Sequence, residues 1–128
     1  MIADTSFLID LLKDDADAHE KLRELEGRNE PIKIPAMAVL ELGIGIGAAL
    51  SDEEKRAVRA ILEPHPIVPM DHRIAMRAGV RIGEVDASTM KKRKGDAAIG
   101  ATADLEGEPV LTRNVDDFER LGFETVTY

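Results

Sequence analysis

Acidic side chains stand at four places in the sequence where they could act together on one substrate or ion. These residues are Asp4, Glu41, Asp96 and Asp117. Carboxylate oxygens, in a chain without cysteine and without paired histidines, favour a hard cation such as Mg²⁺ or Mn²⁺. A divalent ion held by carboxylates lowers the pKa of a bound water and offsets negative charge on phosphorus. The residue types therefore indicate metal-dependent hydrolysis of a phosphodiester.

Glu41 is the most informative of these residues, because its neighbours from Ala36 to Ile44 are otherwise apolar or glycine. A helix that is apolar all round is usually buried. A lone carboxylate in such a helix costs several kcal/mol of desolvation unless a partner offsets it. The alternative interpretation is a glutamate at a wet helix end or one paired with an arginine.

Each of the other acidic residues has a structural explanation of its own. Asp4 and Asp96 could cap the helices that follow them, and Asp116 and Asp117 could form a solvated first helical turn. Carboxylates at one edge would repel each other, by roughly 4 kcal/mol per pair at a separation of about 4 Å and an intermediate dielectric. A cluster of this kind favours a cation bound among its members.

The elements that must position these residues alternate between short apolar strands and helices. We expect strands at 1–3, 31–35, 67–69, 109–112 and 124–127, and helices at 5–12, 15–25, 36–50, 51–64, 71–85, 96–105 and 114–121. This alternation predicts an α/β fold with a parallel sheet and helices on both faces. Functional residues of such folds lie at the carboxyl ends of the strands. Asp4, Glu41, Asp96 and the segment 112–117 should therefore meet at one edge.

Length and composition limit the classes of protein that the chain can belong to. Its 128 residues are 44% hydrophobic, which predicts a single globular domain over residues 1–128. The net charge of −8 excludes a uniformly basic nucleic-acid coat. The absence of cysteine excludes disulfides and Cys-ligated zinc. With no long apolar segment, we expect a soluble, cytoplasmic protein without a membrane partner.

Basic residues are concentrated in one run immediately before Asp96. The run consists of Lys91, Lys92, Arg93 and Lys94. Beside a site for phosphates it would steer a nucleic acid, and the alternative is a solvated loop. A second basic series, Arg73, Arg77 and Arg81, could bind RNA or acidic groups of a partner, or could pair with nearby carboxylates such as Glu84.

Four short motifs in order resemble those of a known family. They are Ile2-Ala3-Asp4-Thr5-Ser6, Glu41-Leu42, Gly95-Asp96-Ala97-Ala98-Ile99, and Leu111-Thr112-Arg113-Asn114-Val115-Asp116-Asp117-Phe118. Together they resemble PIN-domain proteins, and most closely the VapC-type toxins of type II toxin–antitoxin pairs. The resemblance covers essentially the whole chain. It implies a three-layer α/β/α sandwich with a central parallel sheet.

The resemblance also implies an activity and partners. VapC-type toxins are Mg²⁺- or Mn²⁺-dependent endoribonucleases whose site is blocked by a cognate antitoxin, and we expect the homodimer that is usual in the family. Asp4, Glu41 and Asp96 match the acidic positions around the metal, with Asp117 or Asp116 as a further acid. Ser6, Thr112 and Asn114 match supporting positions. Asn114 stands where many members have a fourth aspartate, so a single Mg²⁺ is expected.

Other functions remain as alternatives. A haloacid-dehalogenase type of phosphatase needs a second aspartate two positions after Asp4, and position 6 is Ser. A PIN-like nuclease that acts on other nucleic acid or in RNA processing would use the same chemistry. A non-catalytic metal-binding module should have lost one of the core acids, and Asp4, Glu41 and Asp96 are all present.

Overall fold

Helices and very short strands alternate along the chain in the computed structural model, which describes residues 1–49, 51–85 and 93–128. The elements are β1 (Ile2–Ala3), α1 (Thr5–Leu12), α2 (Ala16–Gly27), β2 (Ile34–Pro35), α3 (Ala36–Ala49), α4 (Asp52–Leu62), β3 (Ile67–Val68), α5 (His72–Glu84), α6 (Lys94–Glu106), β4 (Val110–Leu111), α7 (Val115–Glu119) and β5 (Thr125–Val126). Every expected strand and helix is present, with ends that differ by a few residues.

The strands are parallel throughout. β1 pairs with β4, β4 pairs with β5, and β2 pairs with β3. A single parallel bridge between Ile2 and Lys33 joins the two sheets, which places β1 centrally in the order β3-β2-β1-β4-β5. In the β1–β4 register Ala3 lies opposite Leu111. The next residues, Asp4 and Thr112, therefore emerge side by side at the carboxyl edge of the sheet.

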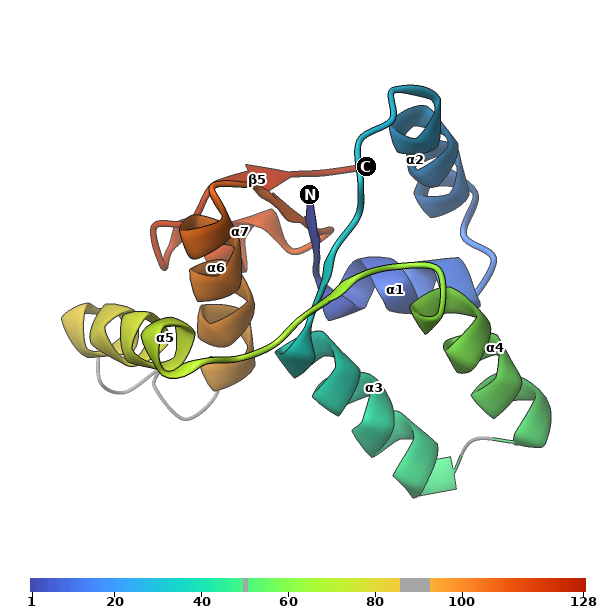
Figure 1. Ribbon diagram of the computed structural model, residues 1–128, viewed down its shortest axis with the longest axis horizontal. Helices are drawn as coiled ribbons and strands as arrows, with labels where there is room; N and C mark the ends of the chain where they lie inside the picture. The colour runs from blue at the N-terminus through green and yellow to red at the C-terminus, as the bar shows by residue number, and fades with distance from the viewer. Residues whose placement is uncertain (50, 86–92) are drawn as a thin grey trace.

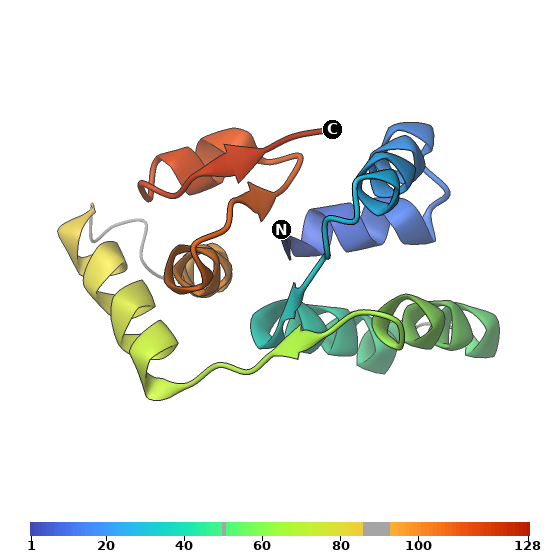
Figure 2. The same cartoon turned by 45° about the horizontal axis from the view of Figure 1, so that its top comes forward.

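The helices form two groups around these strands. Figure 1 shows α1 to α4 on one side of the molecule and α5, α6 and α7 on the other, and Figure 2 shows the strands between them. α5 packs along α6, α1 contacts α2, α3 and α4, and α3 reaches α6. Phe7, Ile34, Ile99 and Phe118 are among the fully buried side chains of the core. The predicted α/β/α architecture around a parallel sheet is confirmed.

Local capping sets several helix starts where the sequence placed them. The Ser51 hydroxyl accepts from the Glu54 amide at 3.2 Å, as an N-cap does, and it donates to the Glu54 side chain at 3.1 Å. Asp71 accepts from the Ile74 amide at 3.0 Å at the start of α5. α6 begins at Lys94, two residues earlier than expected, so Asp96 lies in its first turn.

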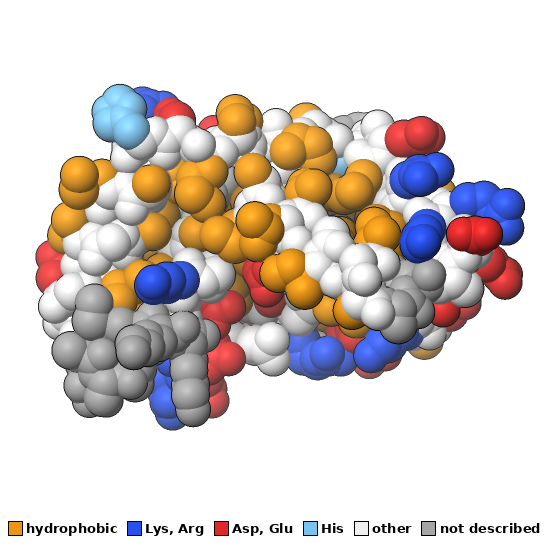
Figure 3. All heavy atoms as spheres, turned by 90° about the horizontal axis from the view of Figure 1, so that it is seen from below, with side chains coloured by type: hydrophobic (Ala, Val, Ile, Leu, Met, Phe, Trp, Pro, Cys, Tyr) orange, Lys and Arg blue, Asp and Glu red, His pale blue; other side chains and the backbone are white. Residues whose placement is uncertain are grey.

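The expectation that α3 is buried on all sides is wrong. Leu40 and Ile44 of α3 are 55% and 65% exposed. They belong to a wider set of exposed large apolar side chains on α3, β3, α5 and the segment between β3 and α5: Leu40, Ile44, Ile67, Met70, Met76 and Val80. We call this set the apolar face; Figure 3 shows hydrophobic side chains forming a band on this side of the molecule. No helix among the described residues is both long and apolar enough to span a bilayer.

Candidate active site

Asp4 occupies the N-cap position of α1, but its side chain makes no capping hydrogen bond. Its Oδ2 instead accepts hydrogen bonds from Ser6 Oγ at 2.6 Å and from Thr112 Oγ1 at 2.7 Å. The residue is 4% exposed. Two hydroxyl donors, one from α1 and one following β4, therefore hold this carboxylate at the carboxyl edge of the sheet, and the capping explanation does not apply.

Glu41 lies in the second turn of α3 and is half-buried. Thr5 Oγ1 donates a hydrogen bond to Glu41 Oε1 at 3.1 Å. A methyl group at Gly95 would lie 3.2 Å from the same oxygen, so glycine leaves the space for this carboxylate beside the first turn of α6. Burial, followed by the charge of Asp4, raises the pKa of Glu41 above its usual range, and the Thr5 hydrogen bond opposes this shift.

Asp96 shares the same electrostatic environment. Its pKa is raised to about 6, first by burial and then by the negative charges of Asp4, Asp117 and Glu41, while Arg93 opposes the shift. Three carboxylates from three other parts of the chain, the N-cap of α1, α3 and α7, thus act on Asp96 at this edge. A proton on Asp96 or a bound cation would relieve their repulsion.

Asp117 lies in the first turn of α7, and it is already paired. Arg93 Nη1 donates to Asp117 Oδ1 at 2.9 Å and lies 3.4 Å from the Asp117 carbonyl oxygen. The neighbouring Asn114 is exposed, and its backbone N–H donates to Thr112 Oγ1 at 2.9 Å. Asp116 is exposed. Of the two aspartates in this turn, Asp117 is the one that acts on Asp96.

Only two of the four residues of the basic run, Arg93 and Lys94, are described by the structure, and their surroundings differ. Lys91 and Lys92 lie outside the described residues. Arg93 contacts Asp117 within the carboxylate group, which is not the solvent-facing position that we expected of a residue that steers RNA. Lys94 is exposed as the first residue of α6 and remains a candidate for contact with phosphates.

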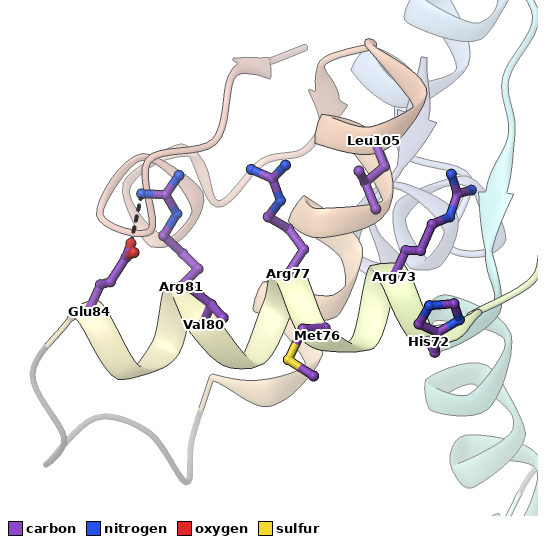
Figure 4. A pocket seen from close by; sticks show the side chains of 8 residues that line it. All are labelled: His72, Arg73, Met76, Arg77, Val80, Arg81, Glu84 and Leu105. Carbon is purple, nitrogen blue, oxygen red and sulfur yellow. Dashed lines mark hydrogen bonds and ion pairs between the residues drawn. The ribbon is translucent and has the colours of Figure 1, made fainter.

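The arginine series on α5 is used in ion pairs. Arg73 pairs with Asp71, Arg77 with Asp104 and Arg81 with Glu84. Figure 4 shows the three side chains along the same side of α5, beside a hollow that Leu105 of α6 also lines. Each pair is partly exposed, so the alternative of local pairing describes these residues.

A sequence model for the PIN domain matches residues 1–124. The chain belongs to the PIN-domain family. This confirms the family that the four motifs predicted.

Solved structures share the fold of this PIN domain. A chain of a toxin–antitoxin complex from Klebsiella pneumoniae is 27% identical, with a TM-score of 0.72 over 91% of this chain and 88% of that one. A chain of VapBC2 from Rickettsia felis, bound to a promoter DNA fragment, is 18% identical with a TM-score of 0.79, covering 99% and 97%. A chain of DNA-bound VapBC from Salmonella typhimurium is 22% identical with a TM-score of 0.78, covering 98% and 96%. No curated protein matches the chain.

Sequence reasoning missed a second polar network behind the PIN-domain site. Asp10 of α1 is 3% exposed, and it accepts from Arg113 Nη1 at 2.7 Å and from Tyr128 Oη at 2.6 Å. Burial and Asp10 raise the pKa of Tyr128, so the phenol stays protonated and remains a donor. The signal in the sequence was an aspartate between the apolar residues Leu8, Ile9 and Leu11 of one helix. A carboxylate buried there without a partner would be costly, so it needs donors from elsewhere in the chain. The network ties the loop after β4 and the segment after β5 to α1.

Thr5 is the other side chain whose role sequence reasoning missed, although it stands within the first of the four motifs. It is 7% exposed and donates to Glu41, so two consecutive hydroxyl residues of α1, Thr5 and Ser6, each hold a different carboxylate. The signal in the sequence was the pair of hydroxyl residues, Thr5 and Ser6, directly after Asp4, since hydroxyls are donors for nearby carboxylates.

The chemistry of these oxygen donors fits a hard divalent cation. Carboxylate ligands suit Mg²⁺, which keeps several of its waters and rarely needs a complete protein cage. The described residues contain no group of three or more acidic or histidine side chains already placed to hold a metal ion. The donors fit such an ion by their chemistry alone: Asp4, Asp96 and Glu41 would supply carboxylate oxygens, and water would complete the coordination.

Thr112→Val should lower the free energy of unfolding by about 1–3 kcal/mol, because it removes a buried hydrogen-bond donor to Asp4 and the acceptor of the Asn114 amide. Chemical denaturation at pH 7 measures this loss. Thr127→Val is the matched control, since Thr127 is exposed. Equal stability of the two variants would contradict the supporting role of Thr112.

Proposed function

We propose that this PIN domain is a Mg²⁺- or Mn²⁺-dependent endoribonuclease and the toxin of a toxin–antitoxin pair, active in the cytoplasm. The observation that carries the proposal is the meeting of Asp4, Glu41, Asp96 and Asp117 at the carboxyl edge of the sheet, with the pKa of Asp96 raised to about 6 first by burial and then by the charges of the other three. Such an acidic group is the ligand chemistry that a divalent ion requires.

Asp4 and Asp96 are the proposed ligands, directly or through water. Bound there, the ion would lower the pKa of a water and offset charge on the scissile phosphate. Ser6 and Thr112 orient Asp4 through their hydroxyl hydrogen bonds. Glu41, whose pKa is raised by burial, accepts the proton of the attacking water. Its hydrogen bond from Thr5 fixes the acceptor oxygen.

The proposed reaction is hydrolysis with inversion at phosphorus. The oxygen of water forms a bond to phosphorus as the bond from phosphorus to the 3′ oxygen breaks. One proton of that water goes to Glu41, and the departing 3′ oxygen takes a proton from a solvent water to become a hydroxyl. The products are a 5′ phosphate and a 3′ hydroxyl. Lys94, together with Lys91 and Lys92 of the same basic run, would attract the RNA backbone to this edge.

An antitoxin is the proposed protein partner, supported by similar chains that come from toxin–antitoxin complexes. A cavity of about 270 Å³ lies between α1, α3 and α4, and it is suited to an apolar segment of such a partner. Ile9, Leu12, Leu42, Ala57 and Val58 line it, and its charged lining residues are two carboxylates, Glu41 and Glu54, and one ammonium, that of Lys13. A segment bound there would cover Glu41 and so block the site. The two glutamates favour a partner segment that also carries a basic side chain.

A second copy of the chain is the proposed occupant of the apolar face. Contiguous exposed apolar surface usually marks an interface, and a symmetric pair would bury the same side chains of both protomers. α3 contributes Leu40 and Ile44, which are 55% and 65% exposed, and α5 contributes Met76 and Val80, which are 67% and 51% exposed. Ile44→Glu should therefore shift the sedimentation coefficient from that of a dimer to that of a monomer. A monomeric wild-type protein would contradict the pairing.

Metal affinity should depend on pH in a direction set by Asp96. Because the pKa of Asp96 is about 6, a proton occupies it at lower pH and competes with the metal. The affinity for Mn²⁺ should be nearly constant above pH 6 and should fall by up to about tenfold per pH unit below it. Calorimetric titration at pH 7.5, 6 and 5 measures this, and equal affinity at pH 7.5 and 5 would contradict it.

The test of the proposed function is cleavage of total cellular RNA by the purified protein with Mn²⁺, followed by mapping of the new ends. We expect discrete 5′-phosphate ends that are absent with Asp96→Asn and absent when the metal is chelated. Single-stranded DNA of the same sequence serves as the second substrate. Cleavage of DNA alone would make the protein a different PIN-domain nuclease. No cleavage, together with no rise in the melting temperature at millimolar Mn²⁺, would favour a non-catalytic module.

A further inference from the structure

Arg93 is a cation built into the acidic edge of the sheet. Its side chain is 20% exposed, and Nη1 donates to Asp117 Oδ1 at 2.9 Å. The same nitrogen lies 3.4 Å from the carbonyl oxygen of Asp117. Two acceptors of α7 thus hold a guanidinium that comes from the N-cap position of α6. The ion pair joins the helix that carries Asp96 to the helix that carries Asp117.

The charge of Arg93 acts on the same group of carboxylates. Asp4, Glu41 and Asp117 each disfavour the ionised form of Asp96, and Arg93 is the cation that opposes them. A guanidinium stays charged at every physiological pH. Part of the negative charge at this edge is therefore neutralised by the chain itself, before any metal ion binds.

A second divalent ion would need the carboxylate that Arg93 already binds. In two-metal phosphodiesterases the ions lie about 4 Å apart and share carboxylates between them. Asn114, on the loop before α7, carries no charge to replace Asp117, and it is exposed. An ion placed at Asp117 would meet a fixed positive charge within the same hydrogen-bonding distance, and like charges repel strongly there.

We propose that Arg93 takes the place of a second metal ion, so that the site holds one divalent cation beside Asp4, Glu41 and Asp96. The inference rests on the proposed function, since it concerns the metal of that site. Asp117 serves to hold the guanidinium, and the guanidinium supplies the positive charge that a second ion supplies in two-metal sites. It also explains why this residue of the basic run faces the carboxylates.

Counting bound Mn²⁺ tests the inference without measuring catalysis. Calorimetry and electron paramagnetic resonance at pH 7.5 should give one ion per wild-type protomer, with the spectrum of an isolated Mn²⁺. Arg93→Met leaves Asp117 unpaired, and it should bind a second, weaker ion with the spin–spin broadening of two ions close together. Arg93→Lys keeps a cation and should bind one ion.

Lys94→Met is the matched control, since it removes one positive charge at the next position. Lys94 is exposed and makes no ion pair with the acidic residues that the structure describes, so this variant should bind one ion. Circular dichroism checks that each variant is folded, and Arg93→Gln replaces Arg93→Met if that variant is not. The number of Mn²⁺ ions bound by the wild-type protein tests the inference whether or not any variant folds.

Three results would decide against the inference. Two ions in the wild type would overturn it while the proposed nuclease function stands, provided that RNA is cleaved. A single ion in folded Arg93→Met, or in Arg93→Gln where it replaces that variant, would show that Arg93 does not exclude the second ion. No binding of Mn²⁺ to the wild type would overturn this inference and the proposed function together.

Discussion

Asp96→Asn should reduce RNA cleavage by on the order of 10³-fold or more, because it removes a ligand of the metal and a charge that no neighbour can supply. Asn keeps the size of the side chain and its position in the first turn of α6. The measurement is the initial rate of cleavage of a labelled RNA at saturating Mn²⁺. The rate is followed at several metal concentrations, so that weaker metal binding is separated from slower chemistry.

The same variant should raise the melting temperature of the metal-free protein. The pKa of Asp96 is about 6 in the folded protein, whereas the ordinary pKa of an aspartate, which applies in the unfolded chain, is 3.8. Folding therefore disfavours the ionised carboxylate. The resulting loss in the free energy of unfolding is absent below pH 4, grows as the pH rises to about 6, and is complete above that value. The advantage of Asp96→Asn over the wild type should therefore be small at pH 4 and largest at pH 7.

Asp104→Asn is the matched control for both effects. Asp104 lies on the same helix, is exposed, and pairs with Arg77 at the surface. Removal of a surface ion pair changes stability by about 1 kcal/mol or less, and cleavage should be unchanged. A loss of activity in Asp96→Asn with an equal loss of stability would indicate a structural role for Asp96. Retained cleavage would exclude it as a metal ligand.

Gly100→Ala should give the largest loss of stability among the glycine-to-alanine substitutions in this chain that add a Cβ within a helix. Gly100 is buried in the middle of α6, and its Cβ would overlap the ring of Phe123, which is 5% exposed. Overpacking of this kind costs about 1–3 kcal/mol, and it outweighs the better helix propensity of alanine. For a chain of this size we expect a melting temperature lower by roughly 5–10 °C.

Gly79→Ala is the matched control, because it makes the same change in the middle of α5. A Cβ at Gly79 meets nothing within 4 Å. This variant should be more stable than the wild type by up to about 1 kcal/mol, the difference in helix propensity between glycine and alanine. A melting temperature of Gly100→Ala equal to that of Gly79→Ala would contradict the close contact between α6 and Phe123.

The sequence by itself determined the succession of elements and the starts of the helices that have local caps. Ser51 and Asp71 accept from the amides of Glu54 and Ile74, three positions ahead, and such contacts are readable because both partners lie within one turn. The alternation of apolar strands with helices then requires a parallel sheet. That requirement brings the residues after β1 and β4, Asp4 and Thr112, to the same edge. The acidic residues could be proposed as a group for this reason.

Only the tertiary structure decided which charges meet. Arg93 and Asp117 are separated by 24 positions, and Asp10 is separated from Arg113 and Tyr128 by 103 and 118. Neither spacing nor composition distinguishes an arginine that faces solvent from one that binds a carboxylate. The exposure of Leu40 and Ile44 was equally hidden, since an apolar helix reads as buried whether its own chain or a partner covers it. Local periodicity encodes the elements, whereas ion pairs and surfaces arise from the packing of elements far apart in the chain.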